Sequence, residues 1–254
     1  MIITGTKEVR KRLGYVAEFC PLCRDVRAFE VTRIGMSKHL YFVAYQKGEL
    51  VGFIRRCMTC RTDLSAVPDT YRQLSDKPLP VQALLPLTHP DLKERYAARL
   101  AVEADLANRF KKVPQATRAE LIKEPFLLLS PKVEKRFGSF KVDELTLGTA
   151  LITWIVLPYI FIWLQDVLPR AAEKVLSVFA AAAFTAGLVA VGVLHYRSAD
   201  RFLRKEIYPV LVPALLPLKP TPQELDTVLK QMAMLGRKIG SKIKLQPLLD
   251  ELGG

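Results

Sequence analysis

Apolar residues follow three different patterns along this chain, and each pattern predicts a different kind of structure. In residues 26–56, short segments alternate apolar and polar positions or are rich in β-branched and aromatic residues, as half-buried strands are. Residues 91–112 carry apolar residues close to the 3.6-residue period of an amphipathic helix, and Leu225, Val228, Leu229, Met232 and Leu235 form an apolar helix face. Between these helical regions, residues 145–164 and 175–196 contain no Asp, Glu, Lys or Arg. We therefore expect a small all-β module joined to an α-helical region with two long apolar helices.

The β module is expected to contain three strands and a short hairpin turn. Residues 26–34 alternate in part, residues 40–45 are β-branched and aromatic, and residues 49–56 form the third strand. Residues 46–48 have the composition of the turn. Residues 1–13 are basic and lack the apolar stretch of a signal peptide, so they are interpreted as a solvated arm or a first strand.

The helices before the apolar segments are predicted from capping signals. A helix over residues 91–112 is expected to be capped by Thr88 or His89, with Pro90 in its first turn. Thr117 opens the capping-box sequence of a second, shorter helix, and Ser130 precedes a brief helical turn that reaches residue 137. The proline-rich residues 67–90 are interpreted as a linker, whose apolar part, residues 81–87, packs against another element.

The C-terminal residues give similar signals. Residues 207–218 are apolar but interrupted by proline, so no third membrane span is predicted there. Thr221, Pro222 and Glu224 form a capping box that opens a helix with an apolar face ending at Gly236. A last short helix is expected at residues 247–252. Residues 81–87 and 212–218 are identical at six of seven positions, although short Leu/Pro strings also recur by chance.

Residues 145–164 and 175–196 are each long enough to cross the ~30 Å hydrocarbon layer of a membrane at ~1.5 Å per residue. Ten residues connect them, so they are predicted to form a transmembrane helical hairpin; buried helices of a soluble core are the alternative. Pro158 is expected to kink the first span. Ala182, Ala186 and Ala190, with Ala183 and Gly187 beside them, form a stripe of small residues that allows another helix to approach closely, by default within the hairpin and alternatively in a homo-oligomer.

Basic residues flank the two spans unequally. The formal net charge is +13, although half of all residues are hydrophobic. Eight cations adjoin the outer ends of the spans and two lie in the connecting loop: Lys132, Lys135, Arg136, Lys141, Arg197, Arg201, Arg204 and Lys205, against Arg170 and Lys174. Because cytoplasmic loops are enriched in Lys and Arg, both termini are predicted to be cytoplasmic. We expect an integral membrane protein, of the inner membrane if the source is bacterial.

All four cysteines of the chain lie in two CxxC motifs, Cys20/Cys23 and Cys57/Cys60. Each motif lets one tight turn direct two thiolates at a single point, and two such turns supply the four thiolates of a tetrahedral Zn²⁺ site. Such a site is coordinatively closed, so its zinc would stabilise the fold. Free thiolates also suit a reducing cytoplasm, whereas disulfides would suit a secreted chain.

Over about residues 13–66, this order of cysteine motif, strands and second motif resembles the zinc-ribbon fold group. The resemblance implies one structural Zn²⁺ bound by Cys20, Cys23, Cys57 and Cys60, but no particular activity. Rubredoxin-like iron sites share the paired motifs and are the main alternative. They typically carry Gly after each motif, whereas this chain has Arg24 and Arg61, which favours zinc.

Basic residues interleave with aromatic residues in the β module. The candidates for contacts with nucleic acid or a protein partner are Arg24, Arg27, Arg33, Arg55, Arg56 and Arg61. Core packing is the alternative role of the aromatic residues, because so small a module needs them for its interior.

No catalytic serine triad, phosphate-binding glycine loop or HExxH sequence occurs, and the three histidines lack metal-ligand spacing. We expect a non-enzymatic, membrane-anchored zinc-ribbon protein that serves as an interaction or scaffold module. A membrane-tethered electron-transfer protein with iron in the same site and a tethered nucleic-acid-binding protein are the alternatives. The expected domains are 1–66 (ribbon), 67–90 (linker), 91–141 (helical), 145–164 and 175–196 (spans), and 197–254 (helical tail).

Overall fold

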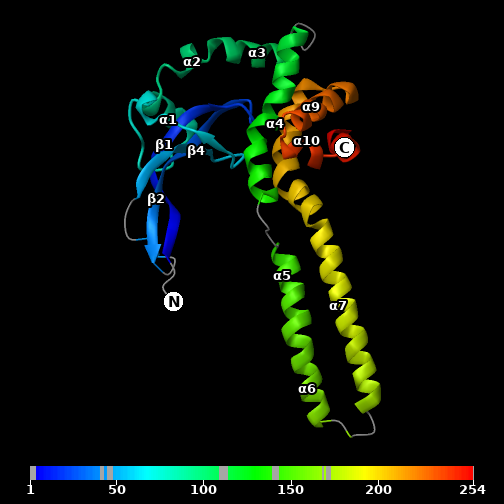
Figure 1. The fold of residues 1–254 in the computed structure, drawn as a ribbon. Coiled ribbons are helices and arrows are strands. Elements are labelled where there is room, and N and C mark those ends of the chain that lie inside the picture. The colour runs from blue at the N-terminus through cyan, green and yellow to red at the C-terminus, as the bar shows by residue number, and fades with distance from the viewer. Residues whose placement is uncertain are drawn as a thin grey trace. The chain divides into compact units, whose positions relative to one another are not determined.

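The structure is a computed structural model that describes residues 4–40, 43–44, 48–108, 114–138, 143–167, 169 and 173–253. The chain divides into two compact units. One unit consists of Met1–Pro131 and Val210–Gly254, and the other of Lys132–Pro209. Antiparallel strands and short helices make up the first unit, and the second contains the two long apolar helices (Figure 1).

The sheet of the first unit is antiparallel, with the strand order β1–β2–β4–β5. β1 (Thr4–Cys20) and β2 (Asp25–Leu40) form a long hairpin, and β4 (Glu49–Cys57) pairs with the other edge of β2. Two short strands, β5 (Asp63–Ser65) and β3 (Val43–Ala44), complete the sheet. The strands predicted at residues 26–34 and 49–56 are thus confirmed, whereas the strand predicted at 40–45 lies partly outside the described residues, which show the end of β2 at Leu40 and the two residues of β3. From Thr4 onward the N-terminal segment is a strand rather than a solvated arm. The predicted turn at residues 46–48 lies mostly outside the described residues.

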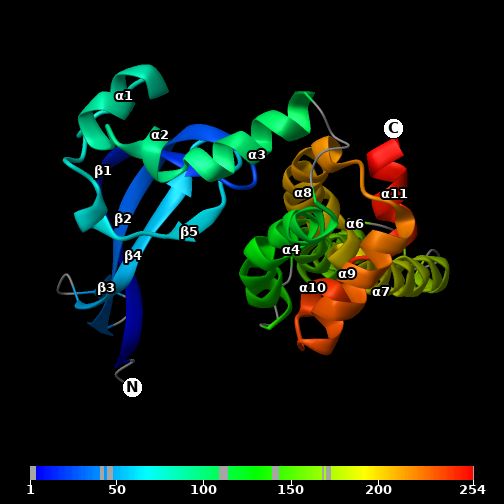
Figure 2. The same ribbon diagram turned by 90° about the horizontal axis from the view of Figure 1, so that it is seen from above.

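Residues 67–90 are more ordered than a linker. They contain the 3₁₀ turn η1 (Pro68–Thr70) and helix α1 (Val81–Thr88), which lies beside the sheet (Figure 2). Leu84 of α1 is buried with Tyr15 and Ala17 of β1, so the predicted packing of residues 81–87 is confirmed. Backbone hydrogen bonds in both directions between Tyr15 and Ser75 also attach this segment to the edge of the sheet.

Three details predicted for the helices before the apolar segments are wrong: the cap of the first helix, and the separate helix starts at Thr117 and Ser130. The first helix divides into α2 (Leu92–Arg95) and α3 (Ala97–Asn108), and its cap is neither Thr88 nor His89. Both of those side chains are buried instead, and the Thr88 hydroxyl accepts a hydrogen bond from the backbone N–H of Ala17. The second and third predicted helices form one continuous helix, α4 (Gln115–Phe137), which begins before Thr117.

The C-terminal prediction is confirmed in more detail. α8 (Tyr208–Leu215) and the turn η6 (Leu216–Leu218) precede α9 (Pro222–Met234), α10 (Lys238–Lys242) and α11 (Leu245–Gly253). At the start of α9, both reciprocal hydrogen bonds of the capping box join Thr221 and Glu224. Gly236 has a φ of 70° at the end of this helix, the left-handed conformation that glycine adopts without steric cost. Leu235, expected on the apolar face, is 61% exposed.

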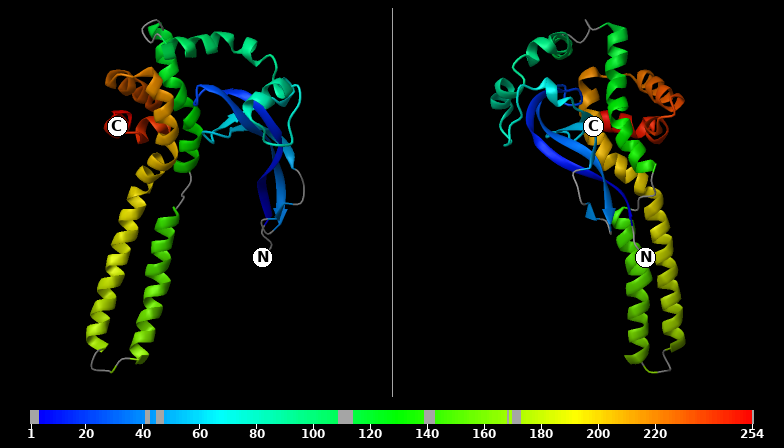
Figure 3. Two further views of the ribbon diagram at one scale, coloured as in Figure 1. Left: turned by 180° about the vertical axis from the view of Figure 1, so that it is seen from behind. Right: turned by 60° about the vertical axis from the view of Figure 1, so that its left-hand side comes forward.

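The second unit contains two antiparallel helices that run side by side in both views of Figure 3. The first comprises α5 (Glu144–Leu151), the π-helical turn η3 (Ile152–Val156) and α6 (Leu157–Val167). The second comprises α7 (Glu173–Phe202) and a further π-helical turn, η5 (Leu203–Ile207), and runs on into α8. Each π-helical turn lies just before a proline, Pro158 or Pro209. Because proline lacks an N–H and its ring collides with the preceding turn, the wider turn lets the helix continue.

Two helical stretches are long and apolar enough to cross a membrane, Glu144–Val167 and Val175–Leu218. They contain the two predicted spans, residues 145–164 and 175–196. Their most apolar stretches are only 11% and 0% buried within the structure, which differs from the core helix of a soluble protein. Large side chains such as Trp154, Tyr159 and Phe179 are more than 60% exposed. An apolar surface of this extent indicates membrane association.

The two long helices do not meet through the alanine stripe. Ala182, Ala186 and Ala190 are all exposed, so these three alanines do not pack within the hairpin. Gly187, which lies beside them in the small-residue stripe, does: a Cβ atom on it would lie 2.6 Å from the Thr153 hydroxyl oxygen, so the predicted close approach within the hairpin is confirmed at this position. The role of the stripe in a homo-oligomer stays a prediction.

Candidate metal centre

Two strand ends bring the four cysteines together. Cys20 is the last residue of β1 and Cys57 the last residue of β4, while Cys23 and Cys60 lie in the turns that follow. β2 joins the two strands, because it pairs with β1 along one edge and with β4 along the other. The sheet therefore carries both CxxC turns at the same end.

The cysteine sulfurs lie at distances suited to one metal ion. The Sγ atoms of Cys20 and Cys60 are 3.7 Å apart, and those of Cys23 and Cys57 are 3.8 Å apart. All four ligand atoms lie within 4.8 Å of one another. A tetrahedron of sulfurs ~2.3 Å from a central ion has edges of about 3.8 Å, whereas a disulfide would need about 2.05 Å. The four cysteines are thus arranged to bind a metal ion.

The residue after each CxxC motif has a left-handed backbone. Arg24 has a φ of 55° and Arg61 a φ of 56°, a conformation that costs most L-residues about 1–2 kcal/mol. The N–H of Arg61 donates to the carbonyl oxygen of Cys57 at 2.9 Å, which closes the second turn. In the first turn, the N–H of Cys23 points at the sulfur of Cys20, 3.4 Å away. Both turns have the backbone shape that glycine favours, although neither contains glycine.

Proton sharing among the thiols also favours a cation at this position. Hydrogen bonding with Cys23 and the other thiols raises the pKa of Cys20, and burial raises it further. Hydrogen bonds from Cys20 and Cys23 lower the pKa of Cys57 to about 7. Four adjacent thiols therefore do not all ionise by themselves. A bound metal ion would supply the positive charge that four thiolates need, and its binding would release protons.

Arg24 ties the first cysteine turn to two helices of the same unit. Its Nε lies 2.7 Å from Glu103 of α3, and the side chains of this ion pair are only 7% and 11% exposed. Its NH1 donates to the carbonyl oxygen of Ala214 in α8. Glu103 also accepts from Arg99, which in turn pairs with Glu124 of α4. A charged network thus runs from the residue next to Cys23 into the helices.

Four of the other candidate arginines have partners of their own. Arg27 pairs with Asp25, Arg56 with Asp63, and Arg33 donates to the carbonyl oxygen of Gly48. Arg55 pairs with Glu18, while Arg61 is exposed. Binding of nucleic acid or a partner through these side chains stays a prediction. Their internal partners give most of them a structural role as well.

A buried polar cluster lies beside the sheet, and the sequence analysis did not find it. Glu18 is 2% exposed, and its carboxylate accepts from Arg55 at 3.3 Å. Arg55 also donates to the hydroxyl of Tyr71, whose pKa is raised by burial. His89 Nδ1 lies 3.6 Å from Glu18, and neither of its buried ring nitrogens has a hydrogen-bond partner among the described residues. The only signal in the sequence was a lone carboxylate in the apolar run Tyr15–Phe19.

No protein-family model matches the chain, and searches of curated proteins and of solved structures found no similar protein. The class of the protein therefore follows from its own residues. It combines a four-cysteine metal-binding cluster on an antiparallel sheet with two apolar helices of membrane-spanning length.

Proposed function

We propose that the chain is a membrane-anchored zinc-ribbon protein whose β module binds a protein partner at the cytoplasmic face and catalyses no reaction. One structural Zn²⁺ would be held by Cys20, Cys23, Cys57 and Cys60. The observation that carries this proposal is the set of four sulfurs within 4.8 Å of one another at one end of the sheet.

The donor set supports a structural role for the metal. Four cysteines fill all positions of a tetrahedral ion, so no position remains for water or substrate. Cys20 and Cys57 are fully buried, which also limits access to the ion. A metal there would join the β1–β2 hairpin to β4 and thereby stabilise the sheet.

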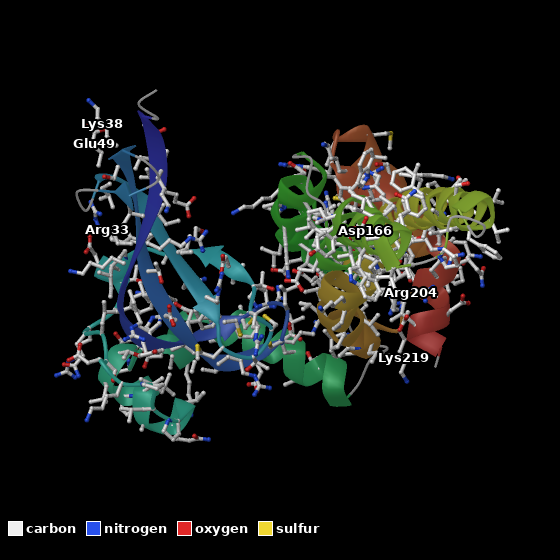
Figure 4. The ribbon with its side chains drawn as sticks, turned by 90° about the horizontal axis from the view of Figure 1, so that it is seen from below. Arg33, Lys38, Glu49, Asp166, Arg204 and Lys219 are labelled. Carbon is white, nitrogen blue, oxygen red and sulfur yellow. The ribbon has the colours of Figure 1, made fainter. Side chains whose placement is uncertain are left out.

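A surface for a partner is available at the other end of the sheet. Figure 4 shows Arg33, Lys38 and Glu49 toward one end of the sheet. By strand register this end is the one distant from the cysteines, because Lys38 pairs with Thr6 whereas Cys20 pairs with Asp25. In the same strands, Met36, Leu50 and Val51 are 40%, 54% and 63% exposed. Exposed apolar side chains bordered by charged ones are typical of protein-binding surfaces.

A second candidate function is electron transfer by iron in the same site. Glycine after each CxxC motif was the feature expected of rubredoxin-like sites. Arg24 and Arg61 adopt the left-handed backbone that glycine normally supplies, so the missing glycines do not argue against iron. Four thiolates suit both metals.

Elemental analysis combined with a visible spectrum tests the proposal. The full chain in detergent is the appropriate sample, because residues after 67 cover Tyr15 and Ala17 of the sheet. One equivalent of zinc and no visible absorption would support the structural role. Iron with thiolate charge-transfer bands would replace it with electron transfer. Reporter fusions in the connecting loop and at the C-terminus test the orientation, and a C-terminus outside the cytoplasm would contradict it.

A further inference from the structure

A cavity of about 430 Å³ lies where α5 begins and α7 ends. This volume is within the ~300–1,000 Å³ range of small-molecule sites. Its wall combines apolar and charged side chains from both helices and from the end of α4. The lining residues include Arg136, Glu144, Leu145, Phe202, Lys205 and Glu206.

The base of the cavity is a fixed polar contact between the two long helices. Arg201 of α7 donates to the carboxylate of Asp143 at 2.6 Å and to the carbonyl oxygen of Leu194 at 2.7 Å. Burial acts to raise the pKa of Asp143, but hydrogen bonds from Thr146 and Arg201 outweigh it and lower that pKa. Asp143 and Arg201 therefore neutralise each other, and neither is available to a ligand.

Among the described residues that line the cavity, the remaining charges sum to a single positive charge. Glu206 is paired with Lys132, 2.9 Å away. Arg136 lies over the ring of Phe202 at 5.9 Å, and no ion pair joins it or Lys205 to a carboxylate among the described residues. Two cations thus face one carboxylate, Glu144. A ligand with one negative charge would neutralise the wall.

The position of the cavity indicates what kind of ligand this is. Leu145 is the second residue of the first long helix, so the cavity lies where the apolar part of the hairpin begins. In a membrane, that level is the headgroup region, where lipid phosphates meet the hydrocarbon layer. Phe202 and Leu145 supply apolar surface next to the two free cations.

We propose that this cavity binds the headgroup of one singly anionic phospholipid, with Arg136 and Lys205 on its phosphate. The inference rests on the proposed membrane insertion of the hairpin. It goes beyond a general attraction between basic residues and an anionic membrane, because it assigns one lipid to one site.

Native mass spectrometry of the full chain from nanodiscs tests this site. Discs containing phosphatidylglycerol are compared with discs of phosphatidylcholine at high salt, which screens exposed charges over a few ångströms. The variants are Arg136→Ala and Lys205→Ala, with Arg204→Ala as the matched control. Arg204 is exposed, belongs to the same helical turn as Lys205 and does not line the cavity.

One retained phosphatidylglycerol per chain is expected, with about fivefold weaker retention after either cavity substitution. The Arg204→Ala control should retain the lipid fully. Equal losses in all three variants, or equal retention of phosphatidylcholine, would overturn the site. Displacement by millimolar inorganic phosphate would assign the cavity to a soluble anion and overturn the lipid assignment. Resistance of the chain to alkaline extraction from membranes reports separately on insertion, so failure of the anchor is distinguished from failure of the site.

Discussion

Glycine substitutions at Arg24 and Arg61 should have opposite effects on metal binding. Both residues follow a CxxC motif and both have a left-handed backbone. Glycine removes about 1 kcal/mol of backbone strain at either position. Arg61 is exposed, so Arg61→Gly removes that strain and little else. If the second turn adopts its left-handed shape only when the metal binds, the relief of strain in Arg61→Gly should raise the affinity of the chain for Zn²⁺ about fivefold.

At Arg24 the same change also breaks a buried ion pair. Loss of one partner from such a pair typically costs about 3–5 kcal/mol. Glu103 keeps its second partner Arg99, so the cost should be near 3 kcal/mol, and about 2 kcal/mol remains after the relief of strain. Arg24→Gly should therefore weaken zinc binding about thirtyfold.

Competition with a chromophoric chelator on the full chain in detergent measures both effects. Arg61→Ala serves as the control, because it removes the side chain but keeps the left-handed requirement, and its affinity should equal that of the parent chain. The reasoning is refuted if both glycine variants shift affinity in the same direction, or if Arg61→Ala binds as tightly as Arg61→Gly.

Three further predictions concern other parts of the chain. Burial lowers the pKa of His89 below the ~6.5 of an unfolded chain, so the free energy of unfolding should fall as pH drops below ~6.5, by at most ~1.4 kcal/mol per pH unit. His89→Phe should therefore flatten the dependence of the melting temperature on pH between pH 7.5 and 5.5. An unchanged slope in this variant would contradict the prediction. Gly187→Leu should separate the long helices, whereas Gly192→Leu, where an added Cβ meets nothing within 4 Å, should not. Both tryptophans of the chain lie in the first long helix, so their fluorescence during thermal unfolding reports this difference, and equal melting of the two variants would refute it. Thr221→Ala should destabilise the chain by about 1 kcal/mol, and Thr117→Ala, inside α4, should have a much smaller effect on circular-dichroism melting.

The features that could be predicted from the sequence depend on residues close together in the chain. The CxxC spacing alone identified the four cysteines that cluster at metal-binding distance, and composition alone identified the long apolar helices. The capping-box signal failed at Thr117, because the helix there begins upstream of the box. Thr117 and Thr221 have the same capping-box spacing, but only Thr221 follows a residue with a left-handed backbone, Lys219, which interrupts the preceding helix. Upstream of Thr117, the helix has already begun at Gln115.

Contacts between distant residues could not be predicted. Glu18 and His89 are 71 positions apart, and nothing in either local sequence indicates that they meet. The outer part of β1 was ambiguous for another reason. Lys7, Arg10, Lys11 and Arg12 are exposed, so this part of the strand shows no alternation of apolar and polar positions. Charged residues on an edge strand such as β1 also oppose pairing with another chain.

The two arginines after the CxxC motifs show how the metal centre connects to the rest of its unit. Similar backbone strain is present at both positions, but among the described residues only Arg24 of the two forms a buried ion pair, with Glu103 of α3, and it also donates to the carbonyl oxygen of Ala214 in α8. Because Arg24 directly follows Cys23, the shape of the first turn sets the position of its guanidinium. Loss of the metal should therefore loosen the contact between the sheet and these helices as well as the two turns. The metal ion would therefore determine whether the sheet and the helices of this unit pack together, even though four cysteines fill all of its coordination positions.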